Sequence, residues 1–439
     1  MNIYDKLRER GIEIGDRVRV LRDNEEICGV LMPRYSIYEG ENLLVIKLDN
    51  GYNVGIEVDE NTKVDLVSKR ERIVFKEEKV LFDKSKPKVS VLSTGGTIAS
   101  RVDYKTGAVY PSLRTEDLIK MIPEIEGLVY LDAKQIMSKF SEDMKKSDWS
   151  LIAREVYRSM KDSYGVIVLH GTDTMSYSAS ALAFSIRNKN VPIIFVGSQR
   201  SSDRPSTDSY FNIKASIITA LKAPFAESVV VMHGETSDSY ALVHRGVKVR
   251  KMHTSRRDAF QTINDYPIAK VHVDRMELEI VGRIIRYRSN EEPVLMDKFE
   301  EKVALIKFYP GFDEGILDYF LEKKYKGIVI EGTGLGHVSN DIIPKIKELI
   351  DNGMIVTMTS QCLFGRIDMK VYSTGRLLLK AGVLPSKDML PETAYVKLSW
   401  LLGNFKDLEE VKRLYLENLE GEINERLSLD MYPKWITDQ

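Results

Sequence analysis

The chain has 439 residues, of which 64 are basic and 65 acidic, giving a formal net charge of -1. This length corresponds to about three ordinary domains. With 43% hydrophobic and 29% charged residues, the composition is that of a globular protein and excludes disordered and fibrous classes. The balanced charge excludes a general electrostatic attraction to nucleic acid or anionic membranes, so nucleic-acid binding would require a local patch or a partner.

The predicted compartment follows from cysteine usage and hydropathy. The two cysteines, Cys28 and Cys362, lie far apart, which is typical of a reducing compartment without a disulfide framework. The N-terminus is charged from Asp5 onward and shows no apolar signal segment. No stretch approaches the ~18 apolar residues that a spanning helix requires. We therefore expect a cytoplasmic protein with no membrane association.

Short alternating segments separated by turn signals run from Gly15 to Val67. This pattern predicts a small antiparallel β-barrel, which we assign to a domain over residues 1–85. These 85 residues carry 18 acidic and 15 basic side chains, a balance that is poor for gripping phosphates. The charge favours a docking or architectural module over a nucleic-acid module.

After Pro87 the apolar runs become continuous, and amphipathic segments lie between them. Continuous β-branched runs that alternate with helices are typical of parallel strands covered on both faces. We therefore predict an α/β domain with a largely parallel sheet over residues 86–275. The expected strands are 89–94, 164–170, 192–197 and 228–234.

The sequence pattern changes over residues 276–300, which we assign to a linker, and a second α/β series follows it. The third domain is expected over residues 301–439. Its apolar runs are KVALIKFYP, KGIVIEGTG and MIVTMTSQC. The periodicity after Gly403 predicts a helical tail.

Two predicted strands end in threonine-containing turns, at the edge of a parallel sheet where ligands bind. The first turn is Thr94-Gly95-Gly96-Thr97, and the second is His170-Gly171-Thr172-Asp173-Thr174. Threonine is a weak nucleophile and needs a neighbouring base or proton relay. Taken singly, the first motif could be only a tight turn, and the second could be only a helix cap. Their occurrence together, in this order, favours a catalytic site.

These motifs, together with VRKMHTSRRDAF at 249–260, resemble the three active-site blocks of the bacterial-type L-asparaginase/glutaminase amidohydrolases. The resemblance runs from about residue 88 to about residue 405. It implies an asparaginase-like body of two α/β domains with parallel sheets. With the N-terminal barrel, the chain further resembles the asparaginase-like subunits of archaeal glutamyl-tRNA(Gln) amidotransferases.

The resemblance also implies roles for individual residues. Thr97 would be the nucleophile that attacks the side-chain carboxamide and forms an acyl-enzyme, and Tyr110 would assist its activation. Thr172, Asp173 and Lys251 would form a second group in which the lysine and carboxylate polarise the hydroxyl and pass protons. The basic run around Lys251 would otherwise be interpreted as a solvated loop.

The substrate contacts implied by the resemblance are Ser141, Glu142 and Gly96. Ser141 and Glu142 would hold the substrate's α-carboxylate and α-amine, with a contribution from Asp173 to the α-amine. The amidase-only relatives often have glutamine where this chain has Glu142, so the individual contact differs there. Backbone N–H groups at the Gly95-Gly96-Thr97 and Thr172 turns are candidate oxyanion donors.

Other signals are weaker. Gly332-Thr333-Gly334-Leu335-Gly336 lacks the dinucleotide-binding spacing, and there is no Walker-type loop. The histidines show no metal-binding spacing, so we expect no metal and no cofactor in this chain. Cys362 is expected to be a buried small hydrophobe.

The leading hypothesis is therefore a glutaminase subunit that releases ammonia from L-glutamine for a partner subunit. By resemblance, that partner binds Glu-tRNA(Gln) and uses ATP and Mg to make Gln-tRNA(Gln), and tRNA is bound mainly through it. We expect a homodimer core within an α2β2 heterotetramer. The alternatives are a free-standing L-asparaginase and a catalytically inactive RNA-binding regulatory module.

Overall fold

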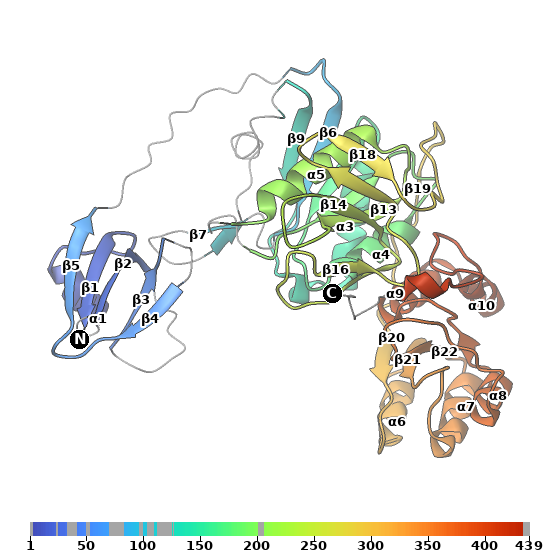
Figure 1. Ribbon diagram of the computed structural model, residues 1–439. Coiled ribbons are helices and arrows are strands. Elements are labelled where there is room, and N and C mark those ends of the chain that lie inside the picture. The colour runs from blue at the N-terminus through green and yellow to red at the C-terminus, as the bar shows by residue number, and fades with distance from the viewer. Residues whose placement is uncertain are drawn as a thin grey trace.

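The computed structural model describes residues 3–22, 25–32, 42–49, 53–69, 83–95, 100–102, 109–111, 125, 127–200 and 206–432. For 100–102 and 109–111 it describes the backbone alone. The main sheets of the described residues follow one another along the chain, in the N-terminal region, in a large central domain and in a C-terminal domain (Figure 1). The two-domain α/β body predicted from the sequence is confirmed.

The N-terminal sheet is antiparallel, with the strand order β4-β3-β2-β1-β5. Alternating side chains such as Val18 and Val20 of β1 face a small core that the short helix α1 covers with Leu7. Among the described residues the edge strands β4 and β5 do not pair, so the predicted antiparallel domain is present as an open sheet. The elements are α1 (Ile3–Glu9), β1 (Arg17–Arg22), β2 (Glu25–Met32), β3 (Leu43–Lys47), β4 (Asn53–Glu57) and β5 (Lys63–Ser68).

The central domain contains an eight-stranded sheet in the order β18-β17-β14-β13-β12-β10-β6-β9. The neighbours from β13 to β9 are parallel, because helices provide the crossovers, and β14, β17 and β18 extend the sheet antiparallel. Its strands are β6 (Lys88–Ser93), β9 (Tyr130–Gln135), β10 (Gly165–Leu169), β12 (Ile193–Val196), β13 (Ser228–His233), β14 (Ala241–Arg245), β17 (Ala269–His272) and β18 (Glu277–Ile280). The helices are α3 (Lys146–Ser159), α4 (Met175–Ser185) and α5 (Ser209–Lys222).

The C-terminal domain is built on a parallel sheet in the order β20-β21-β22-β23. Its helix α9 lies at the junction with the central domain (Figure 1), and its Trp400 stacks on Phe184 of α4 with ring centroids 5.8 Å apart. One apolar core therefore continues from the central domain into the C-terminal domain. The elements are β20 (Val303–Lys307), α6 (Gly315–Glu322), β21 (Gly327–Gly332), α7 (Ile343–Asp351), β22 (Ile355–Ser360), α8 (Ser373–Ala381), β23 (Leu384–Pro385), α9 (Pro391–Asn404) and α10 (Leu408–Leu416).

Small elements complete the two domains. Among the described residues, short antiparallel pairs lie outside the main sheets, and there are single turns of 3-10 helix. The pairs are β7 (Ser100–Val102) with β8 (Val109–Pro111), β11 (Ile186–Arg187) with β19 (Val294–Leu295), and β15 (Val249–Lys251) with β16 (Phe260–Thr262). The 3-10 turns are η3 (Ser141–Asp143), η4 (Asn340–Ile342) and η5 (Leu429–Met431).

The structure differs from the sequence-based expectations at three places. The segment predicted as a linker, 276–300, begins with β18, which pairs with β17 at the edge of the large sheet. Within the described residues, the predicted helical tail is α-helical over α10 and then leaves the helix, because Glu422 accepts backbone hydrogen bonds from Leu419 and Glu420 and fixes that stretch outside a helix. Cys362, predicted to be buried, is exposed, because it follows the carboxyl end of β22.

Candidate active site

The loop that follows β10 carries the second threonine motif. The strand GVIVL is fully buried, and the chain then turns at Gly171 before α4 begins at Met175. A Cβ added at Gly171 would lie 2.8 Å from the Cβ of Ser141, so glycine permits the close approach of these two segments. Thr172 is buried, whereas the side chain of Asp173 is 66% exposed.

Lys251 lies at the end of β15 and reaches both members of this loop. Its Nζ donates to the Oγ1 of Thr172 at 2.9 Å and to the Oδ1 of Asp173 at 2.8 Å. The lysine side chain is only 12% exposed, so these two contacts are partly shielded from water. The structure thus brings together the three residues of the second predicted group. The carboxylate of Asp173 accepts the hydrogen bond from Lys251. The side chain of Thr174, the residue before α4, makes no capping hydrogen bond to this helix.

The predicted substrate residues Ser141 and Glu142 lie in η3, next to this loop. The hydroxyl of Thr174 donates to the backbone oxygen of Ser141 at 2.6 Å, which fixes η3 against the start of α4. Ser141 is buried and Glu142 is exposed. The carboxylate of Glu142 is therefore accessible to solvent.

The first threonine motif begins beside the end of β10. The backbone N–H and the hydroxyl of Thr94 both donate to the oxygen of Leu169, at 3.0 and 2.9 Å. Gly95 has a φ of 111°, and a Cβ there would lie 2.5 Å from the oxygen of Lys139. Glycine is required at this close approach.

Three predicted residues lie wholly or partly outside the described structure. Thr97 and Gly96 are outside the described residues. Tyr110 is described through its backbone alone, in β8 opposite Arg101 of β7. The roles assigned to these residues by resemblance therefore remain predictions.

The arginines around Lys251 each have an acidic partner. Arg250 pairs with Glu392 of α9 at 3.2 Å, and the other two pairs are Arg256 with Asp258 at 2.7 Å and Arg257 with Asp238 at 3.0 Å. The positive charge of the basic run is thus largely neutralised by neighbouring carboxylates. Among these cations, Lys251 is the one that contacts Thr172 and Asp173 in the loop after β10.

His170, directly before the glycine turn, is completely buried. Its Nδ1 lies 2.7 Å from the oxygen of Gly171, and its Nε2 lies 2.9 Å from the hydroxyl of Ser178. Burial lowers the pKa of His170 to about 4, so the ring is neutral at physiological pH. It supports the turn and does not present a titrating group to a substrate.

The sequence interpretation did not single out Gly197, which follows β12. A Cβ at this position would lie 2.7 Å from the oxygen of His170 and 2.9 Å from the Cγ2 of Thr172. Gly197 is therefore needed for Thr172 to pack where it does. The signal that could have identified it is a glycine placed directly after an apolar strand, as in the two threonine motifs.

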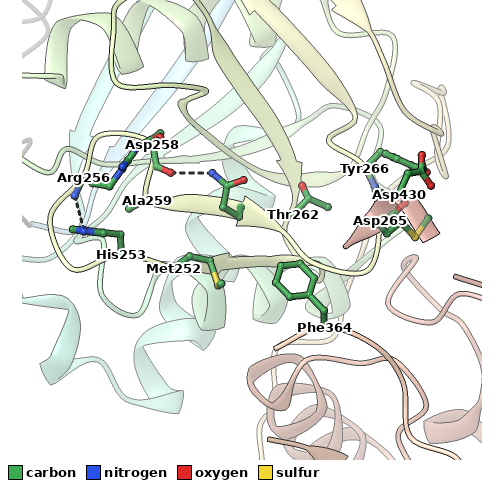
Figure 2. A pocket seen from close by; sticks show the side chains of 12 residues that line it. Met252, His253, Arg256, Asp258, Ala259, Thr262, Asp265, Tyr266, Phe364 and Asp430 are labelled. Atoms are coloured by element: carbon green, nitrogen blue, oxygen red, sulfur yellow. Dashed lines mark hydrogen bonds and ion pairs between the residues drawn. The ribbon is translucent and has the colours of Figure 1, made fainter. Parts of the chain in front are cut away.

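A cavity of about 450 Å³ lies beside the hairpin that carries Lys251. Figure 2 shows that residues of the hairpin tip, such as Met252, line it together with Phe364 of the C-terminal domain. Thr172, Asp173 and Lys251 do not line this cavity. It is therefore separate from the candidate catalytic group.

The described part of the chain contains neither a metal-binding cluster nor a membrane span. Within it, no group of three or more histidine, cysteine or acidic side chains is placed to hold a metal ion. No helix in the described ranges is long and apolar enough to cross a membrane.

Family models match three parts of the chain. The model "Asparaginase, N-terminal" matches residues 88–282, and "Glutaminase/Asparaginase C-terminal domain" matches residues 302–415. The model "GatD N-terminal domain" matches residues 12–67. Fold and site together thus define an asparaginase-type α/β protein with an added N-terminal β domain.

Similar proteins identify the family of this chain more closely. The GatD-type subunit of the glutamyl-tRNA(Gln) amidotransferase of Pyrococcus abyssi is 50% identical, with 98% of this chain and 100% of that protein covered. The corresponding subunit of Metallosphaera sedula is 52% identical, with coverage of 98% and 97%. The thermostable L-asparaginase of Thermococcus kodakarensis has a TM-score of 0.70 and 30% identity over 77% of this chain and 100% of that one. The chain belongs to the GatD family of glutamyl-tRNA(Gln) amidotransferase subunits.

Proposed function

We propose that this chain is the glutaminase subunit of a tRNA-dependent amidotransferase. It hydrolyses L-glutamine and supplies the released ammonia to a partner subunit, which converts Glu-tRNA(Gln) to Gln-tRNA(Gln) with ATP and Mg. The single observation that carries the proposal is the contact of Lys251 with Thr172 and Asp173 after β10. The names of the full-length relatives support the tRNA-dependent role.

In the proposed reaction, the hydroxyl oxygen of Thr97 attacks the side-chain carboxamide carbon of glutamine. The C–N bond breaks, the proton lost by the Thr97 hydroxyl passes to the leaving nitrogen so that ammonia departs, and a glutamyl ester remains on Thr97. Water then attacks the ester and releases glutamate. Tyr110 assists the first proton transfer, and the substrate's α-carboxylate and α-amine are held by Ser141 and Glu142.

The second predicted group, Thr172, Asp173 and Lys251, passes protons during these steps. Because the Oγ1 of Thr172 accepts a hydrogen bond from Lys251, the hydroxyl hydrogen of Thr172 points away from the lysine. It can therefore reach a reacting oxygen or a water molecule. Asp173 accepts a hydrogen bond from the Nζ of Lys251 at 2.8 Å and so holds this nitrogen beside Thr172. Positioned proton transfer of this kind contributes about 10²–10⁴-fold in rate.

The assembly proposed for this function is a homodimer core within an α2β2 heterotetramer. Each chain supplies ammonia, while the partner subunit carries the tRNA, ATP and Mg. The N-terminal sheet is proposed as a docking or architectural module, since its acidic balance disfavours direct phosphate binding.

The test is ammonia release by the purified chain from L-glutamine and, separately, from L-asparagine, with Thr97→Ala as the blank. Each reaction is run before and after addition of the partner subunit and Glu-tRNA(Gln). We expect weak basal turnover of glutamine that rises when both are added. Rapid partner-independent hydrolysis of asparagine would instead identify a free-standing asparaginase. Tight tRNA binding in a filter assay without any hydrolysis would identify an inactive regulatory module.

A further inference from the structure

The hairpin that carries Lys251 is short and has contacts on both of its arms with the C-terminal domain. Only Val249, Arg250 and Lys251 of β15 pair with β16, so the two-stranded ladder by itself provides little rigidity. Lys251 must nevertheless hold its Nζ within 2.9 Å of Thr172. The groups that fix the hairpin therefore determine the geometry of the candidate site.

The first arm is held by the segment 388–393, which leads into α9. The Nζ of Lys248 donates to the Oδ2 of Asp388 at 2.6 Å, and both side chains are completely buried. Two residues further along, Arg250 pairs with Glu392 at 3.2 Å. These contacts hold the chain immediately before Lys251 at two points.

The same segment also holds the helix that follows Thr172. The hydroxyl of Thr393 donates to the oxygen of Val247 at 2.9 Å and lies 3.2 Å from the hydroxyl of Ser180 in α4. Ser180 in turn donates to the oxygen of Gly246 at 3.1 Å. One short segment of the C-terminal domain therefore contacts the element after Thr172 and the strand that ends in Lys251.

The second arm is anchored by Asn264, just after β16. Its side chain exchanges two hydrogen bonds with the backbone of Gly365, both at 2.8 Å. Its backbone oxygen accepts from the side chain of Asn424 at 2.6 Å. Asn264 adopts a φ of 56°, a conformation that asparagine tolerates better than most residues. Both ends of the hairpin are thus attached to the same domain.

From these contacts we infer that Asp388 and Glu392 are positioning residues for Lys251, holding the lysine against Thr172 through Lys248 and Arg250. Neither carboxylate contacts Thr172, Asp173 or Lys251 in the hydrogen bonds and ion pairs of the described structure. Their effect on activity is transmitted through the backbone of β15. The inference rests on the proposed function, because it assumes that Lys251 acts in glutamine hydrolysis.

The structure offers a matched control in the same domain. Glu422 is a buried carboxylate that pairs with the buried ammonium of Lys397 at 2.6 Å. Like Asp388, which accepts from the backbone of Asn424 at 3.0 Å, it also accepts backbone hydrogen bonds from the C-terminal tail. The Glu422 pair does not involve residues 246–251. Glu422→Gln therefore removes a buried ion pair while the hydrogen bonds and ion pairs of the hairpin's first arm stay in place, although the Glu422 carboxylate also acts on Lys248 through space.

The experiment measures kcat and KM for L-glutamine in the full chain with its partner subunit and Glu-tRNA(Gln). We expect Glu392→Gln to lower kcat about 10-fold and Asp388→Asn about 10²-fold, since displacement of a catalytic group by about 1 Å costs about that much. KM should change little. Glu422→Gln should retain kcat within about twofold, although we expect thermal unfolding to show that this variant is destabilised. If Asp388→Asn does not fold, Glu392→Gln carries the test.

The decisive readout is a double-mutant cycle with Lys251→Met. Glu392→Gln should have no further effect on the residual rate of Lys251→Met, because its only route to the reaction is through that lysine. The inference alone would be overturned if Glu392→Gln lowered kcat equally in the wild type and in Lys251→Met. It would also be overturned if Glu392→Gln and Asp388→Asn left kcat unchanged, or if Glu422→Gln lowered kcat as much as they do. Full activity of Lys251→Met would overturn the proposed mechanism and the inference with it.

Discussion

The ammonium nitrogen of Lys251 donates to the hydroxyl of Thr172 across 2.9 Å, although the two residues are 79 positions apart in the chain. One residue ends a short hairpin strand, and the other lies in the loop after a buried parallel strand. The contact forms because the carboxyl ends of parallel strands share one edge of a sheet and the hairpin folds over that edge. This relationship is the geometric centre of the proposed glutaminase site.

Lys251→Met should lower kcat for glutamine by about 10²–10⁴-fold, because the proton relay loses its cation. Ammonia release under saturating glutamine measures the effect. The control is Lys347→Met on α7, since Lys347 also pairs with an aspartate, at 2.7 Å, but lies on an exposed helix face. Equal rates for Lys251→Met and the wild type would exclude a catalytic role for this lysine.

Gly197→Ala should impair activity through Thr172 without removing any polar side chain of the site. The new Cβ would lie 2.9 Å from the Cγ2 of Thr172, so the threonine must move, and a displacement of about 1 Å costs about 10²-fold in rate. Overpacking should also destabilise the fold by about 1–3 kcal/mol. Gly55→Ala in the N-terminal sheet is the control, because its Cβ would meet a leucine side chain at an ordinary 3.4 Å. Unchanged kcat in Gly197→Ala would contradict the proposed packing.

His170 should contribute a pH dependence to the free energy of unfolding. Burial lowers its pKa to about 4 in the folded protein, whereas the unfolded chain has an ordinary value of about 6.5. The unfolded state therefore binds more protons between these values. Stability from this group is present above about pH 6.5 and is lost as the pH falls towards about 4, in total about 3 kcal/mol.

Denaturant titrations between pH 4 and pH 7 measure this contribution. His170→Gln removes the titrating ring and should flatten the pH dependence relative to the wild type. His272→Gln is the control, because His272 is a partly buried residue whose ring lies 3.3 Å from Glu279 on the sheet surface. An identical slope in His170→Gln and the wild type would show that His170 is not buried neutral.

The Lys397–Glu422 pair should show the cost of an unpaired buried charge. Glu422→Gln leaves the ammonium of Lys397, which is completely buried, without its carboxylate and should lower the free energy of unfolding by about 3–5 kcal/mol. The double variant Glu422→Gln/Lys397→Met should recover part of that loss, because no buried charge remains. Urea denaturation compares the three proteins. A double variant less stable than Glu422→Gln would contradict this account.

The local sequence pattern predicted the central parallel strands of the two α/β domains and the order of these domains, but not β9, β14, β17 or β18. The continuous run at 164–170 gave a strand whose observed bounds are Gly165–Leu169, because burial on both faces selects uninterrupted β-branched residues. Periodicity failed in the tail after α10, where buried hydrogen bonds to Glu422 override a local helical preference. Helical propensity is a weak preference that tertiary contacts readily exceed.

The sequence by itself determined which residue types stand at the ends of the strands, and the resemblance of the motifs around Thr172 and Lys251 to a known family predicted that these residues lie together. Only the tertiary structure decided that Lys248 and Arg250 reach Asp388 and Glu392 in another domain. Sequence periodicity reports the burial of one element at a time. The partner of a buried charge depends on how separate domains pack, which no local pattern encodes.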